Sequence, residues 1–169
     1  MMKRTMKRGF TLVEILIVVI ILGILAAIVI PQFTEASSEA RVSNLMTNLQ
    51  TIRSQLLLYK TQHKEAYPAA DTGDTGDTFV SQMTQYTDAD GDTNATPSSD
   101  YPYGPYLMSV PSNPVSGDNT VVIQQTGTTA FSAPAADAGW WLNTVTGEFR
   151  ANLTDSHTTT DGLTKLNEL

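Results

Sequence analysis

The feature that most constrains the fold is an apolar run near the N-terminus, from Phe10 to Ile30. Apart from alanine, only Thr11, Glu14 and Gly23 interrupt its strongly apolar residues. As an α-helix, the run would extend about 31 Å at roughly 1.5 Å per residue, which matches the hydrocarbon thickness of a bilayer. It is longer than the apolar core of an ordinary signal peptide. The run therefore predicts a helix that spans a membrane once.

The segment before this run ends at Gly9 and contains four basic residues, which are Lys3, Arg4, Lys7 and Arg8. Basic residues flanking a span stay in the cytoplasm, so the remainder of the chain is expected on the periplasmic or external side. The carboxylate of Glu14 is the anomaly of the span. An acidic side chain within a membrane costs on the order of 3 kcal/mol, so it indicates a function by default.

The residues from Lys7 to Glu14, in the order Lys-Arg-Gly-Phe-Thr-Leu-Val-Glu, resemble the processing site of type IV prepilins and type II secretion pseudopilins. The resemblance implies a leader of residues 1–9, which a prepilin peptidase removes between Gly9 and Phe10. It implies N-methylation of the new amine of Phe10. The implied fold is α+β, a pilin-like lollipop in which a long N-terminal helix packs on a small C-terminal antiparallel sheet.

Two features of the span bear on assembly. Glu14 lies about one helical turn after Phe10, so its carboxylate can meet the new amine of its own chain or of a neighbour. Pairing recovers much of the cost of a buried charge, and a subunit stacked out of register would leave the carboxylate unpaired. Gly23 and Pro31 bracket a stretch that is expected to loosen on assembly, and Pro31 is expected to kink the helix.

Beyond residues 10–31, residues 32–66 are predicted to continue as an amphipathic helix that Tyr67-Pro68 ends. Apolar residues recur there at alternating intervals of three and four, which is one helical stripe. The stripe consists of Val42, Leu45, Leu49, Ile52, Leu56 and Tyr59. It is expected to seat a small sheet.

Residues 67–154 are predicted to form a loop-rich domain with an antiparallel sheet, followed by a polar tail at 155–169. A short helical piece is expected near Phe79–Tyr86, and the strands at 120–124, 139–143 and 148–152. Trp141 and Phe149 are expected to anchor the core. Trp140 would then face the other way, either exposed or covered by a loop. The tail is expected to be mobile or to dock as a short helix.

The segment from Tyr101 to Pro114 carries Gly-Pro-Tyr-Leu followed by closely spaced prolines and Asn-Pro. It resembles a segment of the major pseudopilin of type II secretion; an ordinary proline-rich loop is the alternative. Its tyrosines and Leu107 are expected to lie across the helical stripe.

The composition of the chain narrows the range of functions that it can have. The chain has 10 Lys and Arg against 17 Asp and Glu, so removing the four basic leader residues leaves 6 − 17 = −11 formal charges. This balance argues against nucleic-acid binding through a basic surface. The chain has no cysteine, whereas many type IV pilins close their C-terminal region with a disulfide. Its two histidines are far apart, and no motif supports catalysis.

One acidic loop is a candidate calcium site, and no other cofactor is indicated. Asp88, Asp90 and Asp92 place oxygen ligands at alternate positions. An EF-hand loop starting at Asp88 would need Gly at position six and Glu at position twelve, where this chain has Thr93 and Ser99. A solvated acidic loop is therefore the competing interpretation.

The sequence thus predicts a structural subunit of a pilus-like helical filament, foremost a type II secretion pseudopilin. A major type IV pilin for adhesion, motility or DNA uptake, and a membrane-anchored periplasmic binding module that never polymerises, stay open. The expected partners are copies of itself, the prepilin peptidase, an inner-membrane assembly platform with minor pseudopilins or pilins, and membrane lipid before assembly.

Overall fold

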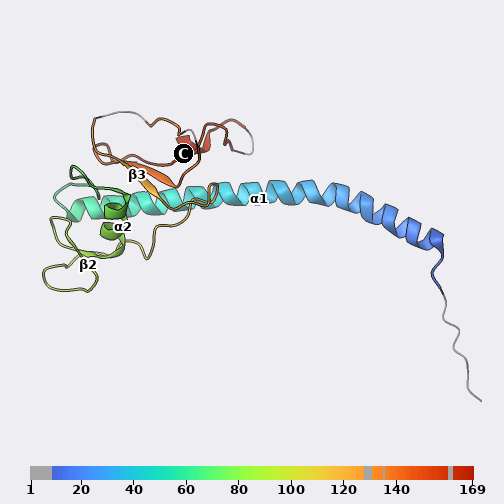
Figure 1. Cartoon of the computed structure of the whole chain (residues 1–169), viewed down its shortest axis with the longest axis horizontal. Helices are drawn as coiled ribbons and strands as arrows, with labels where there is room; N and C mark the ends of the chain where they lie inside the picture. Colours follow the sequence, from blue (N-terminus) through green and yellow to red (C-terminus); the bar gives the residue numbers. More distant parts are fainter. Residues whose placement is uncertain (1–8, 128–130, 135, 160–161) are drawn as a thin grey trace, which may run out of the picture. The chain divides into compact units, whose positions relative to one another are not determined.

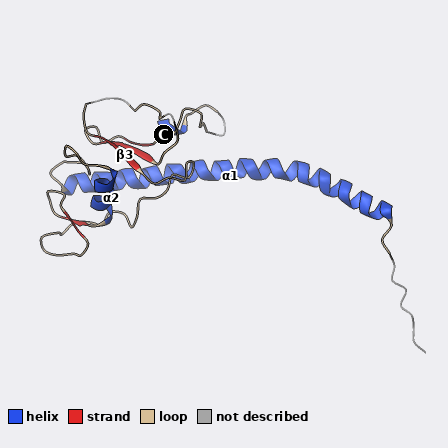
Figure 2. Ribbon diagram, in the orientation of Figure 1, coloured by secondary structure: helices blue, strands red, loops and turns tan. Residues whose placement is uncertain are grey.

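A computed structural model of the chain describes residues 9–127, 131–134, 136–159 and 162–169. Its longest element is the helix α1, Leu12–Gln62, which contains Pro31 (Figure 1). The chain divides between Ser38 and Glu39 into two units, and α1 contributes to both. A long N-terminal helix with an apolar first part is followed by small C-terminal sheets (Figure 2). The α+β class predicted from the sequence is confirmed.

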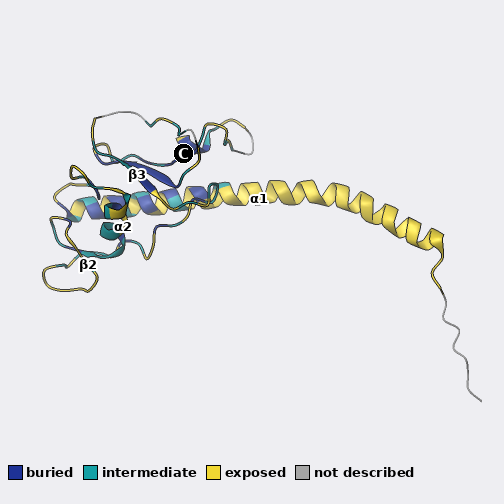
Figure 3. Cartoon of the chain, viewed as in Figure 1, coloured by how far each residue is buried: buried dark blue, intermediate teal, exposed yellow. Residues whose placement is uncertain are grey.

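The two parts of α1 differ in burial. In the first part the side chains are exposed, whereas in the second part buried and exposed residues alternate (Figure 3). The buried positions are Leu45, Leu49, Ile52, Leu56 and Tyr59. These are members of the stripe predicted from the sequence, and Val42 packs against the same core as a partly buried residue. The second part of α1 therefore buries the face that the spacing of its apolar residues predicts.

The C-terminal end of α1 comes earlier than Tyr67-Pro68 predicts. The helix ends at Gln62, and Lys64 and Glu65 adopt positive φ angles of 51° and 66°. Left-handed residues at this position commonly end a helix. The sequence offers no Gly or Asn there to signal the end.

A short helix and a small hairpin follow. Helix α2, Gly76–Thr84, starts three residues before the predicted Phe79, where the amide of Thr75 donates to the hydroxyl of Thr78 at 3.3 Å. The strands β1, Tyr86–Thr87, and β2, Thr93–Asn94, then pair antiparallel.

The three-stranded sheet has the order β3-β4-β5. Its strands are β3 (Val121–Gln124), β4 (Trp140–Asn143) and β5 (Phe149–Ala151). The hairpin of β4 and β5 is antiparallel as predicted, but β3 pairs parallel to β4. The expectation of a purely antiparallel sheet is therefore wrong. The connection from Gln124 to Trp140 is long enough for the crossover that parallel strands need.

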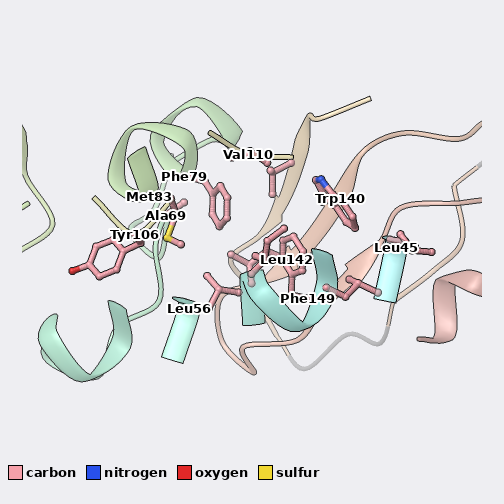
Figure 4. Close-up of a cluster of buried hydrophobic side chains, with 14 of the residues drawn as sticks. Leu45, Leu56, Ala69, Phe79, Met83, Tyr106, Val110, Trp140, Leu142 and Phe149 are labelled. Atoms are coloured by element: carbon pink, nitrogen blue, oxygen red, sulfur yellow. The ribbon is translucent and has the colours of Figure 1, made fainter. Parts of the chain in front are cut away.

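The two tryptophans lie opposite to the prediction. Trp140 is fully buried in the core, with its ring 5.6 Å from that of Phe149, and its indole N–H donates to the Pro111 carbonyl at 2.8 Å. Figure 4 shows it among side chains from α1, α2 and the sheet. Trp141 lies outside this cluster and packs edge-on against Phe131 at 5.2 Å. Alternation along β4 was predicted correctly, but the choice of face was wrong.

Two further contacts complete the domain. Arg53 of α1 donates two hydrogen bonds to the Phe149 carbonyl, at 3.0 and 2.7 Å, and so ties the helix to β5.

The chain ends in a 3₁₀ helix, Leu166–Glu168, whose Leu166 belongs to the core. Of the two expectations for the polar tail, the short docked helix is confirmed.

The proline-rich segment lies across the end of α1, as predicted. Tyr106 is buried against Tyr59, with ring centroids 5.3 Å apart, and its hydroxyl donates to the Gln62 side chain at 2.6 Å. The amides of Tyr106 and Leu107 donate to the carbonyl of Met83 in α2. The segment therefore joins the two helices.

Candidate processing and assembly site

Thr11 and Glu14 cap the first turn of α1. The hydroxyl of Thr11 accepts a hydrogen bond from the Glu14 amide at 3.2 Å. In return, Oε2 of Glu14 accepts from the amide and from the hydroxyl of Thr11, each at 2.8 Å. This reciprocal arrangement is a capping box, which satisfies amides that a helix start leaves unpaired. The Thr-x-x-Glu spacing signals this cap in the sequence, but Glu14 was predicted to pair with the Phe10 amine alone.

The capping box uses only part of the carboxylate. Oε1 of Glu14 has no hydrogen bond to any residue that the structure describes, and the side chain is exposed. In the uncut chain the Phe10 nitrogen is a peptide amide and carries no charge. The predicted pairing of Glu14 with an amine therefore requires the cut and stays a prediction.

The predicted cleavage site is accessible. Gly9 and Phe10 precede α1 outside any helix or strand, and Phe10 is 82% exposed. A Cβ added at Gly9 would meet no atom within 4 Å. The described structure around this peptide bond therefore leaves room for an enzyme to reach it. The basic residues before Gly9 lie outside the described residues.

Gly23 and Pro31 both lie within the exposed first part of α1. A Cβ added at Gly23 would also meet nothing within 4 Å. Pro31 has no amide hydrogen, so the carbonyl of Ala27 loses its usual helical partner. The helix nevertheless continues through both residues, and their loosening on assembly stays a prediction.

The apolar surface of this part of α1 is large. Seventeen large apolar residues between Phe10 and Phe33 are 42–82% exposed. At about 1 kcal/mol for each half-exposed side chain, covering them would stabilise the chain by on the order of 15–20 kcal/mol. By length and composition, α1 is the helix among the described residues that can cross a bilayer.

The candidate calcium loop forms the turn between β1 and β2. Oδ1 of Asp88 accepts from the amides of Asp90 and Asp92, at 2.9 and 3.0 Å, so this carboxylate closes its own turn. Asp90 forms an ion pair with Lys64. Within the described ranges, no group of three or more acidic, His or Cys side chains is placed to hold a metal ion. Calcium at these three residues stays a prediction.

An aromatic group at the end of α1 was not foreseen. His63 is buried and stacks on Tyr59 at 3.7 Å. Its Nδ1 lies 2.8 Å from the Tyr59 carbonyl, which can only accept, so Nδ1 carries the proton and Nε2 accepts from the Thr87 hydroxyl at 2.9 Å. Burial lowers the pKa of the imidazole, and hydrogen bonding to Tyr59 and the charge of Asp88 oppose this shift. His63 therefore links α1 to β1 as a neutral ring.

Comparisons with known proteins identify a family motif over the same residues that contain the predicted cleavage site and Glu14. Residues 4–30 match the family described as the prokaryotic N-terminal methylation motif. The chain is 42% identical over 72 residues to the type II secretion system core protein G of Pseudomonas aeruginosa, a match that covers 43% of this chain and half the length of that relative. It is 30% identical over 118 residues to the protein of the same name from Vibrio cholerae, covering 70% of this chain and 72% of the relative.

A pilin is also similar. The type IV major fimbrial protein FimA of Dichelobacter nodosus is 40% identical over 63 residues, which covers 37% of this chain and 40% of that protein. No solved structure matches the chain. The relatives are non-enzymatic structural proteins, in agreement with the prediction that the chain is not an enzyme. The similarity to the Vibrio cholerae protein covers more than two thirds of both chains and so includes part of the globular domain, and the chain therefore belongs to the family of the type II secretion system core protein G, the major pseudopilins.

Proposed function

We propose that the chain is a structural subunit of a helical filament, a type II secretion pseudopilin that assembles in the cell envelope for protein export. It is inserted in the inner membrane with its N-terminus in the cytoplasm. A prepilin peptidase cuts between Gly9 and Phe10, and the new amine is methylated. Residues 10–31 then form the filament core, 32–66 connect it to the globular domain of 67–154, and 155–169 form its end.

One observation carries this proposal: the apolar surface between Phe10 and Phe33 is exposed around the helix. Lipid covers this surface before assembly, and neighbouring subunits cover it afterwards. Because the subunit exchanges one apolar environment for another, it leaves the membrane without exposing the helix to water. A binding module that never polymerises has no need of this exchange.

The state of Glu14 supports a role for this residue in assembly. Oε2 is occupied by the helix cap, whereas Oε1 is free to accept a hydrogen bond from the methylated amine of Phe10 in a neighbouring subunit. The same carboxylate then fixes the start of its own helix and the position of the next subunit. Thr11 holds the carboxylate in place for both.

Mass spectrometry of the N-terminus combined with electron microscopy of sheared fibres tests the proposal. We expect chains that begin at methylated Phe10 and stay in the envelope at native expression level. A Gly9→Val variant is expected to remain uncut with the same fold, because the added side chain meets no neighbour. Uncut wild-type chains would refute processing and, with it, the filament.

The two roles of Glu14 can be separated by substitution. Glu14→Gln keeps an acceptor for the cap but removes the charge, whereas Thr11→Val weakens the cap and keeps the charge. If amine pairing drives assembly, Glu14→Gln abolishes assembled oligomers and Thr11→Val reduces them only in part. The reverse order would show that capping is the role of Glu14.

A second candidate function is that of a major type IV pilin, which the similarity to the fimbrial protein of Dichelobacter nodosus favours. That similarity covers 37% of the chain, whereas the similarity to the Vibrio cholerae protein covers 70%. The same experiment separates the two functions. Long surface fibres at native expression level would identify a pilin, and loss of protein export on deletion would identify a pseudopilin.

A further inference from the structure

An acidic hollow lies on the globular domain beside α2. Its volume is about 440 Å³, and five carboxylates line it: Asp71, Asp74, Asp77, Asp90 and Asp92. Among the described residues, one ion pair neutralises this group, that of Lys64 with Asp90. The hollow therefore carries a strong negative potential that attracts a cation.

A recess that adjoins the hollow contains a polar group without a hydrogen bond in the described part of the chain. A recess of about 60 Å³ shares Asp71, Asp74 and Asp90 with the hollow, and Tyr59 lines it from α1. Tyr59 is only 2% exposed, and its hydroxyl has no hydrogen bond to any described residue. Burial, then the neighbouring Tyr106 and carboxylates, raise the pKa of this phenol. A neutral hydroxyl thus remains free to accept a hydrogen bond from an incoming cation.

The walls of the hollow are fixed to each other. The Gln82 side chain accepts from the Ala69 amide at 2.7 Å and donates to the Gly91 carbonyl at 3.0 Å. The Gln125 amide donates to the carbonyls of Asp71 and Asp74, at 2.6 and 2.9 Å. The backbone segments that carry the acidic side chains are therefore fixed before a partner arrives, which lowers the entropy cost of binding.

Among the basic residues that the structure describes, Arg41 lacks a partner. Within the described residues, the other Lys and Arg side chains each bind a carboxylate or a carbonyl; they are Arg53, Lys60, Lys64, Arg150 and Lys165. Arg41 is exposed on α1 and has no ion pair or hydrogen bond there. It precedes Tyr59 by 18 residues on the same helix, or about 27 Å. Its guanidinium therefore cannot reach the hollow of its own chain.

We propose that the acidic hollow of one subunit binds the Arg41 guanidinium of a second copy of this chain. The planar guanidinium offers five N–H donors, enough for two carboxylates of the hollow and the Tyr59 hydroxyl in the recess. The two copies are offset by about 27 Å along the helix axis, which brings Arg41 of one level with Tyr59 of the other. This inference rests on the proposed filament and adds a contact between its globular domains.

Disulfide trapping tests the contact, since the chain has no cysteine that would give a background. Full-length Arg41→Cys and Asp92→Cys variants are co-expressed in cells that carry the assembly machinery. We expect a disulfide-linked dimer when both are present. Gln50→Cys with Asp92→Cys is the matched control, because Gln50 is exposed on the opposite face of α1, nine residues or 2.5 turns from Arg41. An equal yield from both pairs would overturn the proposal.

Charge variants provide the second readout. Arg41→Gln and Gln50→Glu each lower the net charge by one, but only the first removes the proposed contact. We expect at least tenfold fewer assembled oligomers for Arg41→Gln, wild-type assembly for Gln50→Glu, and recovery when Arg41→Asp is combined with Asp92→Arg.

The outcomes separate this inference from the proposed function. Assembly of the wild type with no difference between Arg41→Gln and Gln50→Glu would overturn the Arg41 contact and leave the filament intact. If Asp74→Asn with Asp92→Asn reduced export while Arg41→Gln did not, the hollow would bind a different protein and the second copy would be excluded. A wild-type chain that is never cut or assembled would refute the filament, and the contact with it.

Discussion

Exchanging each tryptophan for phenylalanine tests which face of β4 forms the core. Trp140→Phe removes two ring carbons from a fully buried site, at about 0.8 kcal/mol each. It also removes the hydrogen bond to Pro111, which contributes about 1 kcal/mol. The expected loss in the free energy of unfolding is therefore about 2–3 kcal/mol. Trp141→Phe removes the same carbons from a site outside the main core and no described hydrogen bond, so about 1–1.5 kcal/mol is expected.

Urea unfolding of the full chain in a non-ionic detergent measures both values. Because the chain has two tryptophans, each variant keeps one as the fluorescent reporter. Trp140, remaining in Trp141→Phe, should give the more blue-shifted emission in the folded state. A greater loss of stability for Trp141→Phe than for Trp140→Phe would refute the assignment of Trp140 to the core.

Three further predictions concern the contacts of the globular domain. Because burial lowers the pKa of His63 in the folded chain, its neutral form stabilises the fold above about pH 6.5, and this stability is lost as the pH falls through the lowered pKa. A His63→Gln variant should therefore show a smaller change in unfolding midpoint between pH 7.5 and 5.5 than the wild type. An equal change in both proteins would exclude His63 as the source of this pH dependence. Arg53→Met should lose about 1–3 kcal/mol in urea unfolding because two hydrogen bonds to the Phe149 carbonyl disappear, with a smaller loss for Arg53→Lys; equal stability of wild type and Arg53→Met would contradict this. Gln125→Ala should accelerate hydrogen exchange in residues 69–77 while the amides of β4 keep their protection; uniform acceleration would indicate a loss of the whole fold instead.

The long helix was the most predictable part of the fold. The spacing of Leu45, Leu49, Ile52 and Leu56 is enough to define a buried stripe, because helical periodicity is a local property. The hairpin of β4 and β5 is local as well and was predicted for the same reason. The end of α1 was not, because Lys64 and Glu65 adopt left-handed conformations that neither residue type signals.

Contacts between distant segments could not be predicted. Alternation on β4 says that Trp140 and Trp141 face opposite ways, but only the packing of the Pro111 carbonyl and Phe149 decides which one enters the core. The direction of β3 depends likewise on how its long connection returns to the sheet. At the candidate site, the Gly9, Phe10 and Glu14 pattern is contiguous and could be read directly. The acidic hollow joins residues 71–77 to residues 90–92, which only the folded chain brings together.

The attachment of the sheet to α1 has a mechanical consequence. The buried stripe from Leu45 to Tyr59 extends over 14 residue steps, or about 21 Å of helix, and Arg53 holds Phe149 near its middle. A force directed along α1 would therefore act on the core in shear, and many side chains would have to slide at once before any one of them separated. Subunits built in this way resist tension along the helix axis far better than a force that peels the sheet away from its end.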